Sequence, residues 1–178
     1  AYEIAQCLVG SEMCIRDNYD TDDLTGIKMN AQEQPATLKK AETADAFFAV
    51  VKDVAITGNS SRSVELVRPL AQINVGTIGS VVPATFTVKG VPDTFHPFTN
   101  TVSGETNYTW DFTRTTGETF TVDGVEYNYL AMGYLFAPAE GMQVKAELSL
   151  GNGQAITFPQ VELQANRRSN IIGRFTDQ

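Results

Sequence analysis

The sequence predicts an all-β protein, an antiparallel β-sandwich with at most one or two short helices. Apolar and polar residues alternate along most of the chain from residue 61 onward. Glycine-containing turns separate the alternating runs, and prolines stand at their margins. Alternating strands bury one face and expose the other, as the strands of antiparallel sheets do. Strands that recur every ~8–12 residues, with little helix between them, are typical of sandwiches and barrels.

The start of the chain, residues 1–17, lies outside this pattern, and we interpret it as foreign to the protein. Residues 8–17 read LVGSEMCIRD. One permitted codon string for them is similar to the adapter and transposon end that are ligated to DNA fragments in sequencing libraries. We therefore assign residues 1–17 to a translated adapter, exclude them from the fold and expect them to make few contacts. The native part is then residues 18–178, a single domain that lacks its N-terminal strands.

Both cysteines, Cys7 and Cys14, lie in this adapter segment. A zinc site needs three or four nitrogen or sulfur ligands, and beyond the segment the only such side chain is His96. A secretory signal needs an apolar run of about 7–15 residues, whereas the longest run here is Cys7–Val9. We therefore expect neither a metal nor another cofactor, and we assign no role to either cysteine.

The composition limits the class of protein. The chain has 178 residues, is 42% hydrophobic and carries a formal net charge of −8. That length suffices for one domain with a proper core, and that apolar fraction excludes a disordered chain. An acidic chain lacks the basic surface of a nucleic-acid-binding protein. No run approaches the ~20 apolar residues of a membrane-spanning helix, so we expect no transmembrane segment.

The first native element that the sequence suggests is helical. Residues 41–53 read AETADAFFAVVKD, with Thr43 as a possible N-cap before Phe47, Phe48 and Val51. We expect one to three helical turns there.

The elements after it are strands. Residues 84–90, 107–112 and 142–150 alternate strictly, and residues 129–136, YLAMGYLF, are apolar on both faces. The latter run predicts a central strand that is covered on both sides. We expect residues 61–176 to form two packed antiparallel sheets. The residues expected in or beside the shared core are Phe86, Trp110, Tyr129, Leu148 and Ile171.

Turn residues separate these strands. Asp123-Gly124 stands between two alternating runs and predicts a type I′ hairpin, and Asn152-Gly153 is expected to do the same. Two further turns are predicted at Ser103-Gly104 and Thr116-Gly117. The prolines expected at strand margins are Pro83, Pro92, Pro97, Pro138 and Pro159.

Polar candidates for a site are few. His96 has no nucleophile in a local motif beside it, so we expect a histidine at a turn or strand edge. The acidic run 18–26 fails as a calcium loop of the EF-hand type. Asp23 stands where glycine is required and Met29 where the bidentate glutamate belongs, so a solvated loop is favoured.

Two larger groups of residues also have a structural and a functional interpretation. Five aromatic residues could form a sugar-stacking platform, although core packing is favoured: Tyr108, Trp110, Tyr127, Tyr129 and Tyr134. Five glutamates carry no local glycosidase signature, although two of them could converge in space: Glu65, Glu118, Glu126, Glu147 and Glu162. The basic cluster Asn166–Arg168 could be a protease site, and the exposed start of a strand is favoured. We therefore assign no catalytic, cofactor-binding or metal residue, and we expect no enzyme.

Three stretches carry a family resemblance. They are RPLAQINVGT (68–77), TVDGVEYNYLAMGYLFAPAE (121–140) and NRRSNIIG (166–173). Together they resemble the fimbrillin-type surface proteins of Bacteroidales, with Ser169 in place of the usual threonine. Pro69 fits a bend where the chain passes from one sheet to the other, and Gly76 is expected to allow a close turn.

The resemblance implies both a fold and a function. It implies a transthyretin-like sandwich in a lipoprotein that is exported to the outer membrane and becomes a structural or adhesive fimbrial subunit at the cell surface. Its partners would be other subunits, joined by strand addition, and a surface receptor or glycan. The export signal, the lipidated cysteine and the first strands would lie upstream of Asn18, so Cys7 is not the lipidated cysteine. The alternative is a carbohydrate-binding sandwich, which would leave two or three aromatic rings exposed.

Overall fold

The computed structural model describes residues 2–8, 19–20, 25–29, 44–54, 61, 63–79, 84–112 and 118–175. Within these ranges the chain forms strands and turns and no helix, which confirms the predicted all-β class. In the same part of the chain, no helix is available that is long and apolar enough to cross a membrane.

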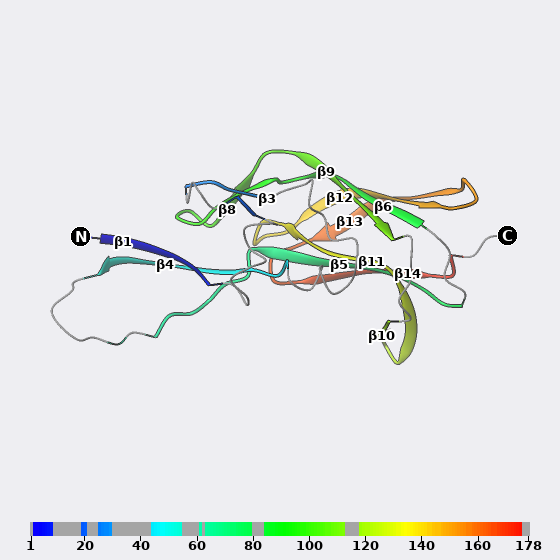
Figure 1. Cartoon of the computed structure of the whole chain (residues 1–178), viewed down its shortest axis with the longest axis horizontal. Coiled ribbons are helices and arrows are strands. Elements are labelled where there is room, and N and C mark those ends of the chain that lie inside the picture. The colour runs from blue at the N-terminus through cyan, green and yellow to red at the C-terminus, as the bar shows by residue number, and fades with distance from the viewer. Residues whose placement is uncertain are drawn as a thin grey trace.

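Two four-stranded sheets form the sandwich (Figure 1). The first sheet consists, in spatial order, of β10 (Thr119–Val122), β11 (Val125–Phe136), β5 (Leu70–Thr77) and β14 (Arg168–Gly173). The second consists of β13 (Ala155–Leu163), β12 (Met142–Leu150), β6 (Ala84–Val91) and β9 (Thr106–Phe112).

Two smaller sheets lie at the same end of the sandwich. One contains β2 (Tyr19–Asp20), β3 (Ile27–Met29), β7 (Thr94–His96) and β8 (Thr101–Ser103). The other is a two-stranded ribbon of β1 (Tyr2–Leu8) and β4 (Phe47–Val54), which reaches beyond the two central sheets in Figure 1.

The core between the two central sheets is built around Trp110. Phe86, on the neighbouring strand, stacks on Trp110 with 5.9 Å between ring centroids, and both rings are buried. A Cβ atom at Gly133 would lie 2.6 Å from the Trp110 ring, so the indole packs directly on the backbone of β11. Leu148 and Ile171 are buried, and Tyr129 packs against this core. The predicted core is confirmed.

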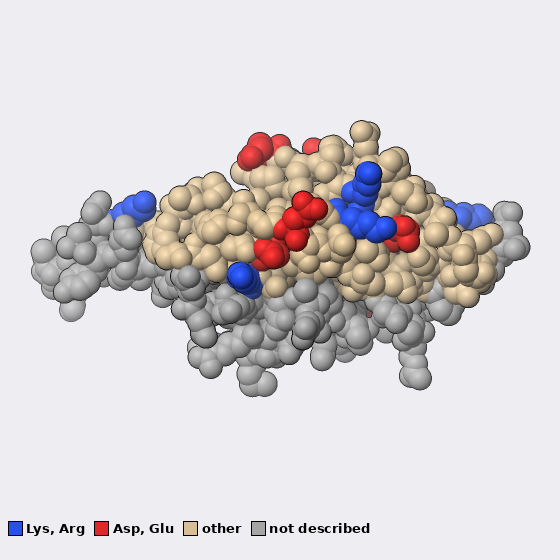
Figure 2. Space-filling model, turned by 90° about the horizontal axis from the view of Figure 1, so that it is seen from above, with Lys and Arg blue, Asp and Glu red and all other residues tan. Residues whose placement is uncertain are grey.

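β11 is the doubly buried strand that the sequence predicts. Residues 130–136 are all buried, and β11 pairs on its two edges with β10 and β5. The outer face of the second sheet, in contrast, is exposed to solvent. There Lys89 and Glu147 form an exposed ion pair at 3.1 Å. Figure 2 shows basic and acidic side chains interspersed on the face seen from above.

β14 pairs with β5 in parallel, the one parallel pair among the paired strands of the described residues. The chain leaves β13 in the second sheet and turns at Asn166, where φ is 59°, so it reaches the first sheet in the same direction as β5. Side-chain amides join these two strands. Gln72 Nε2 donates to Asn74 Oδ1 at 3.0 Å, and Asn74 Nδ2 donates to Asn170 Oδ1 at 3.1 Å. Asn74 is fully buried, so this network satisfies a polar side chain that water does not reach.

The helix predicted over residues 41–53 is wrong, because Phe47–Val54 is the strand β4. A short apolar run fits a helix and a strand equally well by its spacing alone. Its aromatic and β-branched residues favour the strand once a pairing partner is present. Thr43 lies outside the described residues.

β1 also differs from expectation, since residues 1–17 were expected to make few contacts. Tyr2–Leu8 pairs antiparallel with β4, for example Cys7 opposite Phe48 and Ala5 opposite Val50. Strand pairing uses backbone groups that every sequence has, and an apolar edge recruits any available strand. The pairing therefore leaves the adapter origin of residues 1–17 a prediction.

Most of the turn predictions are confirmed. Asp123 and Gly124 both have positive φ, 50° and 80°, as a type I′ hairpin requires. Gly104, with φ of 77°, turns the chain between β8 and β9. The chain bends at Pro69, between a bridge of Val67 to β4 and the start of β5. Thr116-Gly117 and Pro83 lie outside the described residues.

Three local predictions need correction. At Asn152-Gly153 only Gly153 has positive φ, and residues 151–154 form a wider loop between β12 and β13. Pro159 lies within β13 rather than at its margin; β13 is an edge strand, and its pairing register with β12 shifts beside this residue. Gly76 lies inside β5 and makes no turn. A Cβ there would lie 2.5 Å from the Phe120 ring, so glycine leaves room for that ring.

Candidate interaction groove

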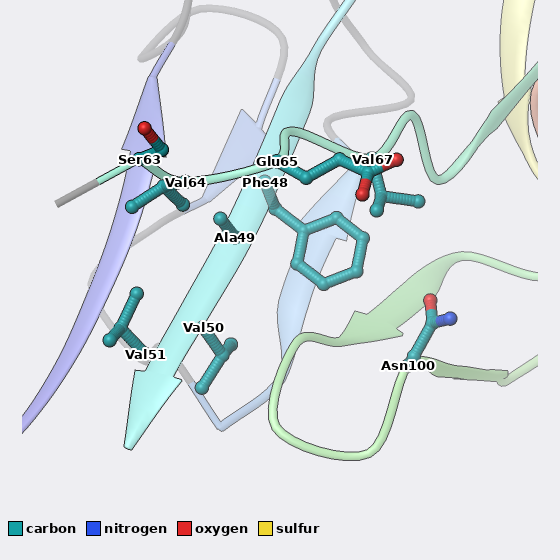
Figure 3. Close-up of a pocket in the computed structure, with 9 residues that line it drawn as sticks. All are labelled: Phe48, Ala49, Val50, Val51, Ser63, Val64, Glu65, Val67 and Asn100. Carbon is teal, nitrogen blue, oxygen red and sulfur yellow. The ribbon is translucent and has the colours of Figure 1, made fainter. Parts of the chain in front are cut away.

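The site that the structure offers is a groove between β4 and the extended segment Ser63–Val67. Phe48 and Val67 exchange two backbone hydrogen bonds: the Phe48 N–H donates to the Val67 carbonyl at 2.9 Å, and the Val67 N–H donates to the Phe48 carbonyl at 2.8 Å. Beyond this bridge the two segments diverge (Figure 3). The space between them measures about 710 Å³ and is called the β4 groove below. Its lining residues are Phe48, Ala49, Val50, Val51, Ser63, Val64, Glu65, Val67 and Asn100.

The walls of the β4 groove are mostly apolar. β4 supplies a run of phenylalanine, alanine and valine, with Val50 and Val51 half-buried. Across from it, Val64 and Val67 line the groove and are 47% and 42% exposed. Leu66, between them in sequence but outside the lining, is 42% exposed. Apolar side chains that gather on a surface mark sites of interaction.

The edge of β4 that faces the groove is mostly open. In an antiparallel ladder, alternate residues direct both backbone groups to the same neighbour. Phe48 directs its groups to Val67, so Val50 directs its groups toward the same side, away from β1. The alternation ends after Val51, where the pairing of β4 with β1 shifts in register. Within the described part of the chain, no strand pairs with that edge beyond Phe48.

The closed end of the groove is fixed by an ion pair. Arg68 Nε donates to Asp45 Oδ1 at 2.8 Å and Arg68 Nη2 donates to Asp45 Oδ2 at 2.7 Å, a bidentate geometry. The same guanidinium lies 4.7 Å from the centre of the Phe47 ring. Phe48 packs edge-on against Phe95 of β7, with 4.6 Å between ring centroids. These contacts anchor the first residues of β4 to the body of the sandwich.

His96 is the last residue of β7, an inner strand of its sheet, and stands directly before the turn at residues 97–100, as the turn interpretation predicts. It holds two neighbours together. Its Nδ1 lies 2.7 Å from the Thr25 carbonyl, and its Nε2 lies 2.7 Å from Ser103 Oγ. Because a carbonyl can only accept, Nδ1 donates to Thr25, and in the neutral ring Nε2 then accepts from the Ser103 hydroxyl. Sequence reasoning missed Ser103, since the pair forms only when β7 folds back on β8. The pair ties the turn before β3 to β8.

The other predicted candidates do not come together. Tyr108 and Trp110 are buried, Tyr127 and Tyr134 nearly so, and Tyr129 packs against the core, so these rings form no exposed platform. None of the five glutamates is buried: Glu65 lines the β4 groove and Glu147 pairs with Lys89, while the remaining three are exposed. Asn166 and Arg167 form an exposed turn that leads into β14 at Arg168, as the strand-start interpretation predicts. Among the described residues, no cluster of three or more potential metal ligands occurs.

Comparison with known proteins gives a family. A family model matches residues 8–177, nearly the whole chain. The chain belongs to DUF6562, a family of unknown function. The match begins at residue 8, inside the segment that the sequence analysis assigns to an adapter, and the native start of this DUF6562 chain stays a prediction.

Solved structures that are similar to the DUF6562 chain share little sequence with it. One is a candidate cell adhesion protein from Bacteroides ovatus, with 14% identity and a TM-score of 0.49; the match covers 83% of this chain and 54% of that one. Another is a candidate adhesin from Bacteroides thetaiotaomicron, with 12% identity and a TM-score of 0.47, covering 88% of this chain and 54% of that one. The DUF6562 chain thus spans about half the length of either protein. No curated protein matches it in sequence.

Proposed function

We propose that this protein is a structural or adhesive subunit of a bacterial cell-surface fimbria that acts by strand-mediated assembly and contact. The observation that carries the proposal is the open edge of β4 beside the apolar β4 groove. The three sequence stretches that resemble fimbrillin-type proteins support it. An outer-membrane location and a lipid anchor belong to the same proposal, as do other fimbrial subunits as partners.

An incoming strand would use the two kinds of group that the groove presents. The backbone groups of Val50 would pair with the backbone of the incoming strand, which gives affinity without regard to sequence. Alternate side chains of that strand would enter the space between Val50 and Val64. Glu65 on the rim would favour a partner with a basic residue.

A proline substitution tests this assignment. Val50→Pro removes the N–H that faces the open edge and leaves the hydrogen bonds between β4 and β1 in place. We expect the unaltered chain to form oligomers that grow with concentration in sedimentation velocity. Val50→Pro should raise the concentration at which oligomers appear by about ten-fold or more, since one lost backbone contact of 1.4 kcal/mol corresponds to that factor.

Val50→Thr is the matched control, because it keeps the N–H and nearly the same shape. It should assemble like the unaltered chain. Equal assembly of Val50→Pro and Val50→Thr, with both folded by circular dichroism, would contradict the use of this edge. We do not propose the carbohydrate-binding alternative, because the five rings that would serve it are packed into or against the core.

A further inference from the structure

The segment Ser63–Leu66 lies beside the open edge of β4 without pairing with it, and the bridge at Phe48 and Val67 fixes how it could pair. In an antiparallel ladder, each step forward on one strand meets a step back on the other. Continued from this bridge, the register places Val50 opposite Glu65 and Val51 opposite Val64. Val50 is the residue of β4 whose backbone groups point toward the open side.

The side chains suit this register on one face of the ribbon. There Ala49 would lie opposite Leu66 and Val51 opposite Val64, so each pair is apolar. The pairing would cover Val64 and Leu66, two of the most exposed large apolar side chains of the described residues.

The segment Ser63–Leu66 is fixed at its C-terminal end, where Val67 and Arg68 are held, and it can turn about that end. Val67 is held by its two hydrogen bonds to Phe48, and Arg68 is held by Asp45. From there toward Ser63, among the described residues, no backbone hydrogen bond joins the segment to β4. A two-stranded ribbon is marginally stable in water, whereas a third strand makes a sheet that can persist.

We propose that Ser63–Leu66 is a strap that closes on β4 as a third strand, and that the β4 groove is the open state of this strap. Closure itself follows from the register and needs no partner. The second step, in which the closed strap blocks the edge against an incoming strand, rests on the proposed function. The strap would then keep single subunits from assembling until it opens.

Engineered cysteines test closure directly, in a background with Cys7→Ser and Cys14→Ser. Val51→Cys with Val64→Cys places two thiols at a facing, non-hydrogen-bonded pair, where the Cα atoms are about 4.5 Å apart and suited to a disulfide. The control, Val51→Cys with Glu65→Cys, places its side chains on opposite faces of the same two segments. With oxidised glutathione, the first pair should close at least about ten-fold faster, as followed by loss of free thiols in mass spectrometry. Equal rates, or a faster control, would overturn the register.

Hydrogen exchange tests closure in a chain without engineered cysteines. Glu65→Pro removes an N–H that the closed strap would direct to β4, whereas the N–H at Val64 points away from it. Glu65→Pro should therefore speed exchange of the Val50 amide. Val64→Pro should leave the exchange rate of that amide much closer to its rate in the unaltered chain. The same exchange rates in all three chains would mean that the strap does not close.

The oxidised and reduced forms of the Val51→Cys, Val64→Cys chain separate gating from closure. If the oxidised chain stays monomeric in sedimentation velocity and the reduced chain assembles, the strap gates the edge. If both forms assemble alike, the strap closes without gating. If the disulfide forms as expected and neither form assembles, closure stands and the proposed function fails.

Discussion

At the scale of single residues, the core depends on the packing of the large Trp110 side chain against Gly133, which has no side chain. Trp110 occupies the space that a side chain at residue 133 would need, since a Cβ there would lie 2.6 Å from its ring. Replacing Trp110 by alanine should lower the free energy of unfolding by about 3–5 kcal/mol, as for other large buried aromatic residues. Gly133→Ala should lower it by about 1–3 kcal/mol, because the indole cannot move away.

The double variant decides whether these two costs share a cause. With the indole gone, the methyl group at residue 133 has room, so Trp110→Ala with Gly133→Ala should cost clearly less than the two single changes together. Urea unfolding of the four chains measures this coupling. Simple additivity would show that Gly133 is required for another reason, such as its backbone conformation.

Tyr108, two residues before Trp110, makes stability depend on pH. Burial, with a smaller contribution from the nearby Asp93 carboxylate, raises the pKa of the Tyr108 hydroxyl. The folded state therefore holds this proton more tightly than the unfolded chain, where tyrosine has a pKa of about 10. Its contribution is fully present below about pH 10 and is lost as the pH rises further toward the folded pKa.

Tyr108→Phe should remove this dependence. The hydroxyl is buried and has no hydrogen-bond partner among the described residues, so the change should alter stability at neutral pH by less than about 1 kcal/mol. Urea midpoints at about pH 8 and about pH 10.5 provide the measurement. An equally steep loss of stability in Tyr108→Phe would assign the alkaline transition to other groups.

At the scale of elements, β14 is held to the first sheet by the buried amide network as well as by its backbone. Asn74→Ala leaves the Gln72 and Asn170 amides without their shared partner and should cost about 1–3 kcal/mol in urea unfolding. The amides of Ile171 and Ile172 should then exchange faster than those of β12. Asn170→Ala serves as the comparison and should cost less stability, because Asn170 is exposed. Unchanged exchange in β14 would show that the network does not hold it.

The elements also show how far sequence reasoning extends. Local patterns predicted β6 and the strands from β9 to β13, because alternation and turn residues act over a few neighbours; the three-residue strands β7 and β8 were not predicted. They failed at Phe47–Val54, where the choice of strand depends on a distant partner, and at Arg168–Gly173, whose direction depends on where the chain crosses between sheets. The position of the β4 groove was not predicted. Among the described residues, its two walls pair only at Phe48 and Val67, and no local pattern at either residue indicates the other.

At the scale of the whole molecule, the association that we propose depends on the ribbon of β1 and β4. β1 covers one edge of β4, and the groove leaves most of the other edge open. Deleting residues 1–8 should therefore expose both edges of an apolar strand and increase association at a given concentration. Sedimentation velocity of the shortened and unshortened chains measures this effect. If the shortened chain is the more monomeric of the two, β1 itself mediates the association.

The parallel pairing of β14 also sets the order in which the molecule can fold. Asn74 and Asn170, which bond to each other across β5 and β14, are 96 residues apart in the sequence. Contacts between such distant residues form slowly, because a long loop must close before they are made. A ribosome must therefore release residues 168–173 before the first sheet can gain this strand. Until then the edge of β5 that β14 covers is unfilled, and such an edge on a nascent chain is open to association with other strands.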